Sequence, residues 1–205
     1  MSWIATPEWA GETVYLVAGG PSLRYQQHLE VLRYRCTIVI NDSYELLPKA
    51  DYLYFCDARW WSTRSAKVAA RFQGRHIVTM RNVIPGVSTL DCTGVDGLET
   101  DPAAIRHGNN SGYQAINLAY HLGAKRIVLV GYDMRLGRNG ETHWNYGQRP
   151  EGARDNDYEN VIRYSMLPHF KTLAAPLEAA GVEVLNATPQ SALQVWPAVT
   201  LKEVL

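Results

Sequence analysis

Short runs of apolar residues alternate along the chain with longer segments of helical periodicity. The runs are four or five residues long and are bounded by polar residues, glycine or proline. Apolar runs of this length are typical of strands in a parallel sheet that is covered on both faces. We therefore predict strands at Val14–Ala18, Thr37–Ile40, Tyr52–Cys56, His76–Met80, Arg126–Val130 and Val182–Leu185.

The segments between these runs carry apolar residues at the three- and four-residue spacing of amphipathic helices. Strands that alternate with helices indicate an α/β fold, with a mainly parallel sheet and helices on both faces. Pro168 and Pro176 should kink or split the last helix, because proline lacks the N–H that a helix interior needs. The predicted helices are Tyr25–Tyr34, Arg59–Phe72, Tyr113–Leu122 and Asp157–Ala180.

The bulk composition adds limits to this fold class. The chain has 205 residues, of which 46% are hydrophobic, so residues 1–205 suit one domain with a substantial core. The formal net charge is zero, which gives no bulk indication of nucleic-acid binding. No apolar run approaches the roughly 20 residues of a membrane span, so we expect no membrane partner. Three scattered cysteines, Cys36, Cys56 and Cys92, predict buried thiols in a reducing cytoplasm.

Polar residues, glycines and aromatic residues follow four of the predicted strands. Ligands of open parallel sheets bind beyond the carboxyl ends of the strands, so these residues are candidates for a binding site. They are Gly19, Gly20, Pro21 and Ser22 after the first strand, Asn41, Asp42 and Ser43 after the second, Asp57, Arg59, Trp60 and Trp61 after the third, and Gly131, Tyr132 and Asp133 after the fifth.

Two of the predicted helices begin in glycine- and serine-containing segments, "GGPS" at 19–22 and "GNNSG" at 108–112. Glycine lets the backbone approach a ligand closely, and the amides at a helix N-terminus attract phosphate. Each segment alone is equally explained as a tight turn before a capped helix. Together, at one edge of a sheet, they favour a ligand that carries phosphate. Neither matches the dinucleotide fingerprint or the P-loop.

A basic stretch follows the third predicted strand. No Asp or Glu occurs from Ala58 to Leu90, and Arg64, Lys67 and Arg71 share one helical face. With the tryptophans before them, these residues could bind a polyanion, which makes nucleic acid a weakly indicated partner. The alternative is a solvated basic face whose acidic partners come from elsewhere in the chain.

The segment 135–152 is long, polar and rich in glycine, as expected of a lid over a binding site. It contains His143, which we take as the candidate general base because imidazole ordinarily titrates near neutral pH. Asp133 is a second catalytic candidate, and His107 is held in reserve. The chain has no metal-binding motif, although the strand-end aspartates could hold Mg²⁺ with phosphates or could instead cap turns.

Taken together, these motifs resemble a known group of proteins. The segments "AGGPSL", "VIND", "NNSGYQAINLAYHLGAKRIVLVGYDM" and "THW" are similar to those of bacterial sialyltransferases of the Campylobacter type. They also resemble the related group that includes archaeal 6-hydroxymethylpterin diphosphokinase, and above all small phage-encoded members of this superfamily. The resemblance spans roughly Val14 to Ala192. It implies a single Rossmann-like domain under a lid that binds a cytidine nucleotide sugar without needing a metal.

The resemblance also carries roles to single residues. It implies that Asn41, Asp57 and the two glycine–serine segments hold the nucleotide, and that His143 of the lid is the base. The chain departs from the family at Gly19, where the family has asparagine, and at Gly108, where it has the catalytic arginine. The implied nucleotide-binding residues, with the neighbouring Gly19 and Asn110 added, are Gly19, Gly20, Pro21, Ser22, Asn41, Asp57, Asn110, Ser111 and Gly112.

Three functions follow from these observations. The first is a nucleotide-sugar-dependent glycosyltransferase that requires no cofactor and whose acceptor is a small molecule, a nucleotide or a DNA base. The second is a diphosphotransferase that acts on a hydroxymethyl pterin or base with ATP and Mg²⁺, with Asp57 and Asp133 as ligands. The third is a nucleotide-binding protein without catalytic activity. In each case we expect the substrate or acceptor to contact Arg59, Trp60, Tyr132 and Trp144.

Overall fold

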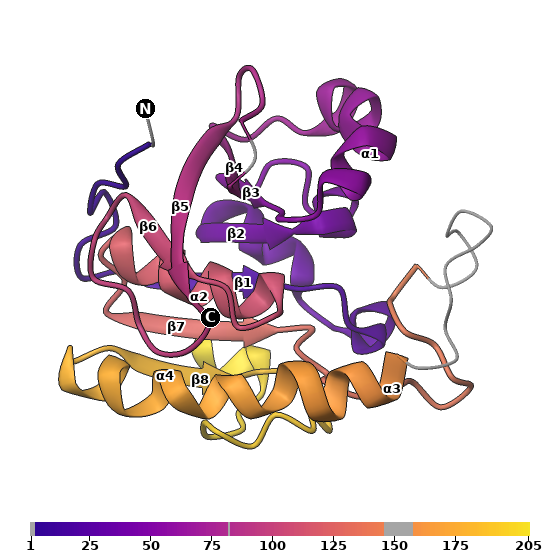
Figure 1. The fold of residues 1–205 in the computed structure, drawn as a ribbon. Coiled ribbons are helices and arrows are strands. Elements are labelled where there is room, and N and C mark those ends of the chain that lie inside the picture. Colours follow the sequence, from indigo (N-terminus) through magenta and orange to yellow (C-terminus); the bar gives the residue numbers. More distant parts are fainter. Residues whose placement is uncertain (1–2, 82, 146–157) are drawn as a thin grey trace.

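The computed structural model describes residues 3–81, 83–145 and 158–205. Within these ranges eight strands form one sheet in which every pairing is parallel (Figure 1). The predicted fold class is confirmed: the chain is α/β, consistent with a single Rossmann-like domain. The strands are β1 (Thr13–Val17), β2 (Cys36–Ile40), β3 (Tyr52–Tyr54), β4 (His76–Met80), β5 (Ser88–Gly94), β6 (Ala104–Arg106), β7 (Arg126–Val130) and β8 (Glu183–Asn186).

The order of the strands creates a reversal in the middle of the sheet. The order is β6-β5-β4-β3-β2-β1-β7-β8, so the chain runs outward from β1 to β6 and then returns to place β7 beside β1. Beyond the two strands the backbone pairing continues, with Ala18 N donating to Val130 O and Gly20 N to Gly131 O, each at 2.9 Å. Open α/β sheets bind ligands at such a reversal.

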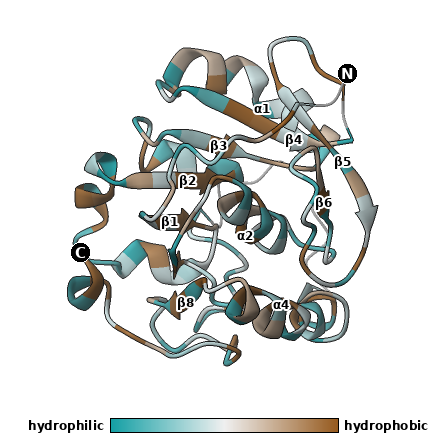
Figure 2. Ribbon diagram, turned by 90° about the vertical axis from the view of Figure 1, so that its left-hand side faces the viewer, coloured by the Kyte–Doolittle hydropathy of each residue, from teal (hydrophilic) through white to brown (hydrophobic). Residues whose placement is uncertain are grey.

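Alternating side chains of the strands build two hydrophobic cores, one on each face of the sheet. In β1, Val14 and Leu16 pack on the face covered by α2 and α4, whereas Tyr15 and Val17 pack on the face covered by α1. Figure 2 shows brown, hydrophobic segments in the strands, including β1, β2 and β3. A strand that is buried on both sides needs apolar residues at every position, which explains the uninterrupted runs in the sequence.

The α-helices of the described residues lie at three of the four predicted helices, and one stretch between them is irregular. They are α1 (Ala58–Arg71), α2 (Ser111–His121), α3 (Tyr158–Asn160) and α4 (Leu167–Ala179), and a π-helical turn, Val161–Met166, joins the last two. Pro168 lies in the first turn of α4, directly after the π-helical turn, and Pro176 lies inside α4 without ending it. None of the helices in the described ranges has the length and apolar character needed to cross a membrane.

The prediction of an α-helix at Tyr25–Tyr34 is wrong. The chain instead forms two short 3₁₀ turns, η1 (Pro21–Tyr25) and η2 (Leu29–Tyr34), separated by a break. His28 at the start of η2 has a φ of 65°, a left-handed conformation that no α-helix can pass through. The buried Leu29 and Leu32 are three residues apart, and a 3₁₀ helix places residues at this spacing on one face.

Two strands, β5 and β6, are additional to the six that were predicted. In β5 only Leu90 is fully buried, and the polar side chains of Asp91 and Thr93 are exposed, so the segment lacks an apolar run. β6 has three residues, too few for a recognisable pattern. Both lie at one edge of the sheet, where burial is least complete.

The last described residues close the other edge of the sheet. Asn186 of β8 donates its backbone N–H to Pro197 O at 2.8 Å and accepts from Val199 N at 3.0 Å. Further on, Leu201 is buried in the core on the α1 face, and the hydroxyl of Tyr15 donates to Val204 O. The segment after β8 is therefore part of the packed structure.

Acidification should destabilise the fold through His121, which is 7% exposed. Its Nε2 donates to Ala104 O at 2.8 Å, and burial lowers the pKa of the imidazole. Below about pH 6.5 the unfolded chain takes up a proton that the folded chain resists, so the free energy of unfolding should decrease. In His121→Gln the amide nitrogen can donate to the same carbonyl without titrating, and we expect a weaker pH dependence.

Urea denaturation between about pH 5 and 8 measures this effect. His28→Asn is the control, because His28 is exposed and asparagine tolerates its left-handed conformation. An equal pH dependence in the wild type and His121→Gln would contradict the assignment of the effect to His121.

Candidate functional site

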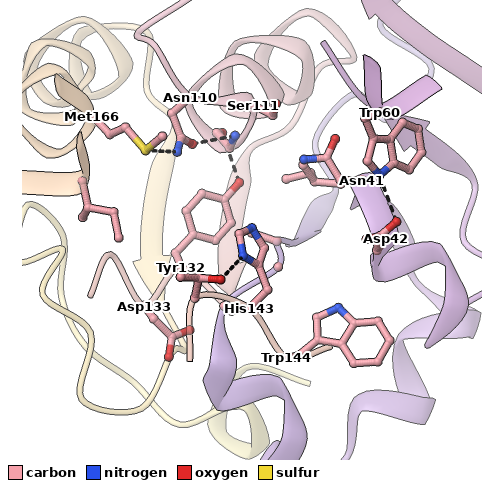
Figure 3. A pocket seen from close by; sticks show the side chains of 18 of the residues that line it. Asn41, Asp42, Trp60, Asn110, Ser111, Tyr132, Asp133, His143, Trp144 and Met166 are labelled. Carbon is pink, nitrogen blue, oxygen red and sulfur yellow. Dashed lines mark hydrogen bonds between the residues drawn. The ribbon is translucent and has the colours of Figure 1, made fainter. Parts of the chain in front are cut away.

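A cavity of about 640 Å³ opens at the carboxyl edge of the sheet, beside the reversal between β1 and β7 (Figure 3). Loops after β1, β2, β3 and β7 line it, together with the starts of α1 and α2 and part of the predicted lid. Ser22 is absent from its lining and lies behind Asp133. The strand-end candidates Ser43 and Trp61 are also absent from the lining. The remaining predicted site residues line it: Gly19, Gly20, Pro21, Asn41, Asp57, Arg59, Trp60, Asn110, Ser111, Gly112, Tyr132, Asp133, His143 and Trp144.

Asp133 anchors the first glycine segment. Its carboxylate accepts hydrogen bonds from Ser22 N at 3.0 Å and from Ser22 Oγ at 2.8 Å. The side chain is 5% exposed, and this burial raises its pKa although the bonds from Ser22 act in the opposite direction. Both oxygens accept hydrogen bonds from Ser22, so Asp133 positions the first glycine segment.

The second glycine segment forms a capped helix start. Asn110 Oδ1 accepts from the amides of Gly112 at 2.7 Å and Tyr113 at 3.2 Å, which satisfies two of the first amides of α2. Gly112 lies against the ring of Tyr132, whose hydroxyl donates to Gly112 O at 3.1 Å. Tyr132 is 2% exposed and lines the cavity, and burial raises the pKa of its hydroxyl well above the ordinary value.

Asp57 and Arg59 mark the start of α1. Asp57 Oδ1 accepts from Arg59 N at 2.8 Å, as an N-cap side chain does. Both side chains are exposed at the rim of the cavity. Asp57 therefore caps a turn, which was the alternative to binding Mg²⁺, and its Oδ2 remains at the rim of the cavity.

Asp42 joins three elements around the cavity, a role that sequence reasoning missed. Its Oδ1 accepts from Trp60 Nε1 at 2.9 Å and from Arg64 Nε at 3.1 Å, and its Oδ2 accepts from Asn145 Nδ2 at 2.9 Å. The carboxylate thereby connects the end of β2 to α1 and to the predicted lid. In the sequence, the only indication of this role is that Asp42 directly follows a strand. Its partner Asn145 lies in no periodic pattern, so the sequence gives no indication of their contact.

His143 lies over the glycine segment that follows β1. Its Nδ1 is 3.1 Å from Thr142 Oγ1, and its ring centroid is 5.6 Å from that of Tyr158. The next residue, Trp144, donates its backbone N–H to Gly19 O at 3.0 Å. Of the predicted lid, Arg135 and residues 142–145 line the cavity, whereas residues 146–152 lie outside the described residues.

Two polar atoms in the lining have no hydrogen-bond partner among the described residues. They are Asn41 Oδ1, an acceptor, and Trp144 Nε1, a donor, and both are buried. Asn41 has a φ of 51°, a strained conformation that is enriched at functional sites. A buried polar atom without a partner is destabilising, so these two atoms are candidates for contact with a polar ligand.

The basic face of α1 is paired within the chain. Arg64 bonds to Asp42, Lys67 Nζ lies 2.6 Å from Glu45 Oε2, and Arg71 Nη1 lies 3.9 Å from the same oxygen. This arrangement supports the alternative explanation, a solvated face with acidic partners elsewhere in the chain. The structure adds no support for nucleic acid as a partner.

The reserve base, His107, supports the second glycine segment from behind. It is absent from the lining of the cavity, and its Nδ1 accepts from Asn109 N at 3.1 Å. Burial lowers its pKa. Asn109 in turn donates towards His169 Nε2 at 3.2 Å, and His169 Nδ1 bonds to Asp96 at 2.7 Å. His107 is therefore a support for the loop.

Other lining residues carried no signal in the sequence. Ile162 and Met166 come from the π-helical turn, far along the chain, and form an apolar wall. Met166 Sδ accepts from Asn110 Nδ2 at 3.3 Å, which couples this wall to the start of α2 (Figure 3). The described residues contain no group of three or more His, Cys, Asp or Glu side chains that could hold a metal ion.

Comparison of the chain with protein-family models, with curated proteins and with solved structures found no significant match. The geometry of the cavity is therefore the basis for inferring a function.

A matched pair of glycine substitutions tests how tightly the first segment is packed. A Cβ on Gly20 would lie 1.8 Å from Asp133 Oδ2 and 2.5 Å from Gly131 O. A Cβ on Gly19 would meet only the edge of the His143 ring, at 2.9 Å, and that ring can move. We expect Gly20→Ala to lower the free energy of unfolding by roughly 1–3 kcal/mol, and Gly19→Ala by less. Urea denaturation of both variants measures the difference, and equal effects would contradict the tight packing.

Proposed function

We propose that the chain is a nucleotide-sugar-dependent glycosyltransferase. The observation that carries this proposal is that a single cavity gathers both glycine–serine segments and His143. Its volume of about 640 Å³ lies within the usual range for small-molecule sites. A phosphate-bearing donor with a sugar attached suits a cavity that has helix starts on one side and a histidine on another.

The lining offers complementary groups for each part of a nucleotide. The Ser111 hydroxyl at the start of α2 suits phosphate, because helix N-termini attract anions. The unpartnered Asn41 Oδ1 suits an exocyclic amino group of a base, and Trp144 Nε1 suits a carbonyl oxygen. Trp60, partly exposed at the rim, provides a ring on which a base or ribose can pack.

The chemistry proposed for this site is a single transfer. His143 removes the proton from the acceptor hydroxyl, and the acceptor oxygen forms a bond to the anomeric carbon of the sugar. The bond from that carbon to the phosphate oxygen breaks, and the nucleotide leaves with the electron pair. The described part of the lid covers the cavity and limits the entry of water, which would otherwise replace the acceptor.

The metal-dependent diphosphotransferase has weaker support. Of its expected ligands, Asp57 accepts from Arg59 N at the start of its own helix, and Asp133 accepts from Ser22 of the loop after β1. The nucleotide-binding protein without activity would use the same cavity, and only turnover separates it from the transferase.

A ligand panel with one variant tests the nucleotide part of the proposal. The panel contains CMP, CDP, UDP, GDP, ATP and their sugar derivatives, with Mg²⁺ or with a chelator. A ligand at about a hundredfold excess over its Kd should stabilise the chain by about 2.7 kcal/mol in thermal unfolding. In Asn41→Gly, glycine keeps the left-handed backbone but removes the amide, so binding should weaken by about 1 kcal/mol.

His28→Gly is the matched control, because His28 is also left-handed but exposed and outside the cavity. Equal affinity of the wild type and Asn41→Gly would argue against this placement of the base. Stabilisation that requires Mg²⁺ would favour the diphosphotransferase.

Substitution of the proposed base should separate binding from transfer. His143→Gln should keep the nucleotide affinity, while transfer falls by roughly 10²–10⁴-fold, since general-base catalysis contributes about this much. The rate of nucleotide release from the bound nucleotide sugar, with water or an added acceptor, measures the transfer. Normal turnover in His143→Gln would show that another group is the base, and absence of turnover in the wild type would favour the binding protein.

A further inference from the structure

A second cavity, of about 480 Å³, adjoins the first. The two cavities share Pro21, Asp133 and Arg135, so the second one continues from the wall where Asp133 anchors the first glycine segment. It lies between η1 and the loop after β7. The nucleotide site proposed above does not account for it.

The second cavity is lined by three arginines. Arg24 comes from η1, and Arg135 and Arg138 come from the loop after β7. In the described part of the chain, neither Arg135 nor Arg138 takes part in an ion pair. Guanidinium groups brought together in this way bind phosphate and carboxylate groups well, because each can offer two parallel N–H donors.

The two carboxylates of this cavity already have partners within the loops. Asp133 accepts from Ser22, and Glu141 accepts from Asn139 N at 2.9 Å and from Asn139 Nδ2 at 3.0 Å. These hydrogen bonds hold both carboxylates in place but do not remove their charges. Three arginines against two carboxylates give the lining a formal net charge of +1.

Neighbouring groups hold two of the arginines in place. Arg135 Nη2 donates to Gln190 Oε1 at 2.9 Å, and Arg24 Nε donates to the carbonyl oxygen of Trp144. Arg24 thus connects the second cavity to the residue that follows the proposed base. Beside it, the ring of Tyr25 is 82% exposed and offers an apolar surface for the body of a ligand.

We propose that the second cavity binds an anionic group, a phosphate or a carboxylate, through Arg24, Arg135 and Arg138. If the proposed function holds, the anionic group bound here is part of the acceptor. An acceptor held by its anionic end in the second cavity would reach the junction at Pro21 and Asp133, where the two cavities meet. The acceptor class is then a phosphorylated or carboxylated hydroxy compound, and neutral sugars are poor acceptors.

Calorimetry with inorganic phosphate and with acetate tests the site in the full chain. The best-binding nucleotide of the panel is present throughout, so that the main cavity is filled. Arg138→Gln removes an arginine that is exposed and outside the main cavity, and we expect at least about tenfold weaker binding of the anion. Arg138→Lys should retain more affinity, and Arg33→Gln, an exposed arginine outside both cavities, should retain all of it.

The outcomes separate this inference from the proposed function. If only the binding of phosphate depends on Arg138, the acceptor is phosphorylated. If the binding of both phosphate and acetate depends on Arg138, the acceptor class also includes carboxylates. If no nucleotide binds but anion binding still depends on Arg138, the glycosyltransferase fails and the anion site stands. Equal anion affinity in the wild type and Arg138→Gln, or no anion binding in either, would overturn the inference.

Discussion

The hydrogen bonds between Asp133 and Ser22 are the interaction on which the rest of the site depends. They connect the loops after β1 and β7 across the reversal in the sheet, at 3.0 and 2.8 Å. Gly20 has no side chain because the carboxylate occupies the space that a Cβ would need. Burying a carboxylate is costly unless hydrogen bonds compensate, so the two residues stabilise each other only when both strands are in register. Asp133 lines both cavities, so this contact fixes a wall that the two cavities share.

A second carboxylate, Asp42, plays the corresponding part on the other side of the main cavity. It accepts from an indole, a guanidinium and an amide that belong to α1 and to the loop after β7. Because Asn145 is one of these donors, the position of the loop that carries His143 is coupled to the sheet through a hydrogen bond as well as through Trp144 N. The site is thus assembled by polar contacts between loops, on a scaffold whose interior is apolar.

The contrast between scaffold and loops explains what the sequence could predict. Strands such as β1 and β7 were predictable because burial on both faces demands apolar residues at every position, as from Val14 to Val17. The candidate residues at the strand ends were predictable because parallel topology brings those ends together. The partners of Asp42 and the wall formed by Ile162 and Met166 were not, since contacts between distant segments leave no local period. The helix at Tyr25–Tyr34 failed because the left-handed His28 interrupts it.

The bonds of Asn186 to the segment after β8 also govern how the sheet meets other molecules. The exposed edge of a sheet presents unpaired amides and carbonyls, which makes it a template for pairing with another chain. Here the backbone N–H and C=O of Asn186 are already used by Pro197 and Val199. At the opposite edge, β6 is only three residues long. Removal of the chain from Pro197 onward would therefore do more than shorten it: β8 would be left open to edge-to-edge association and aggregation.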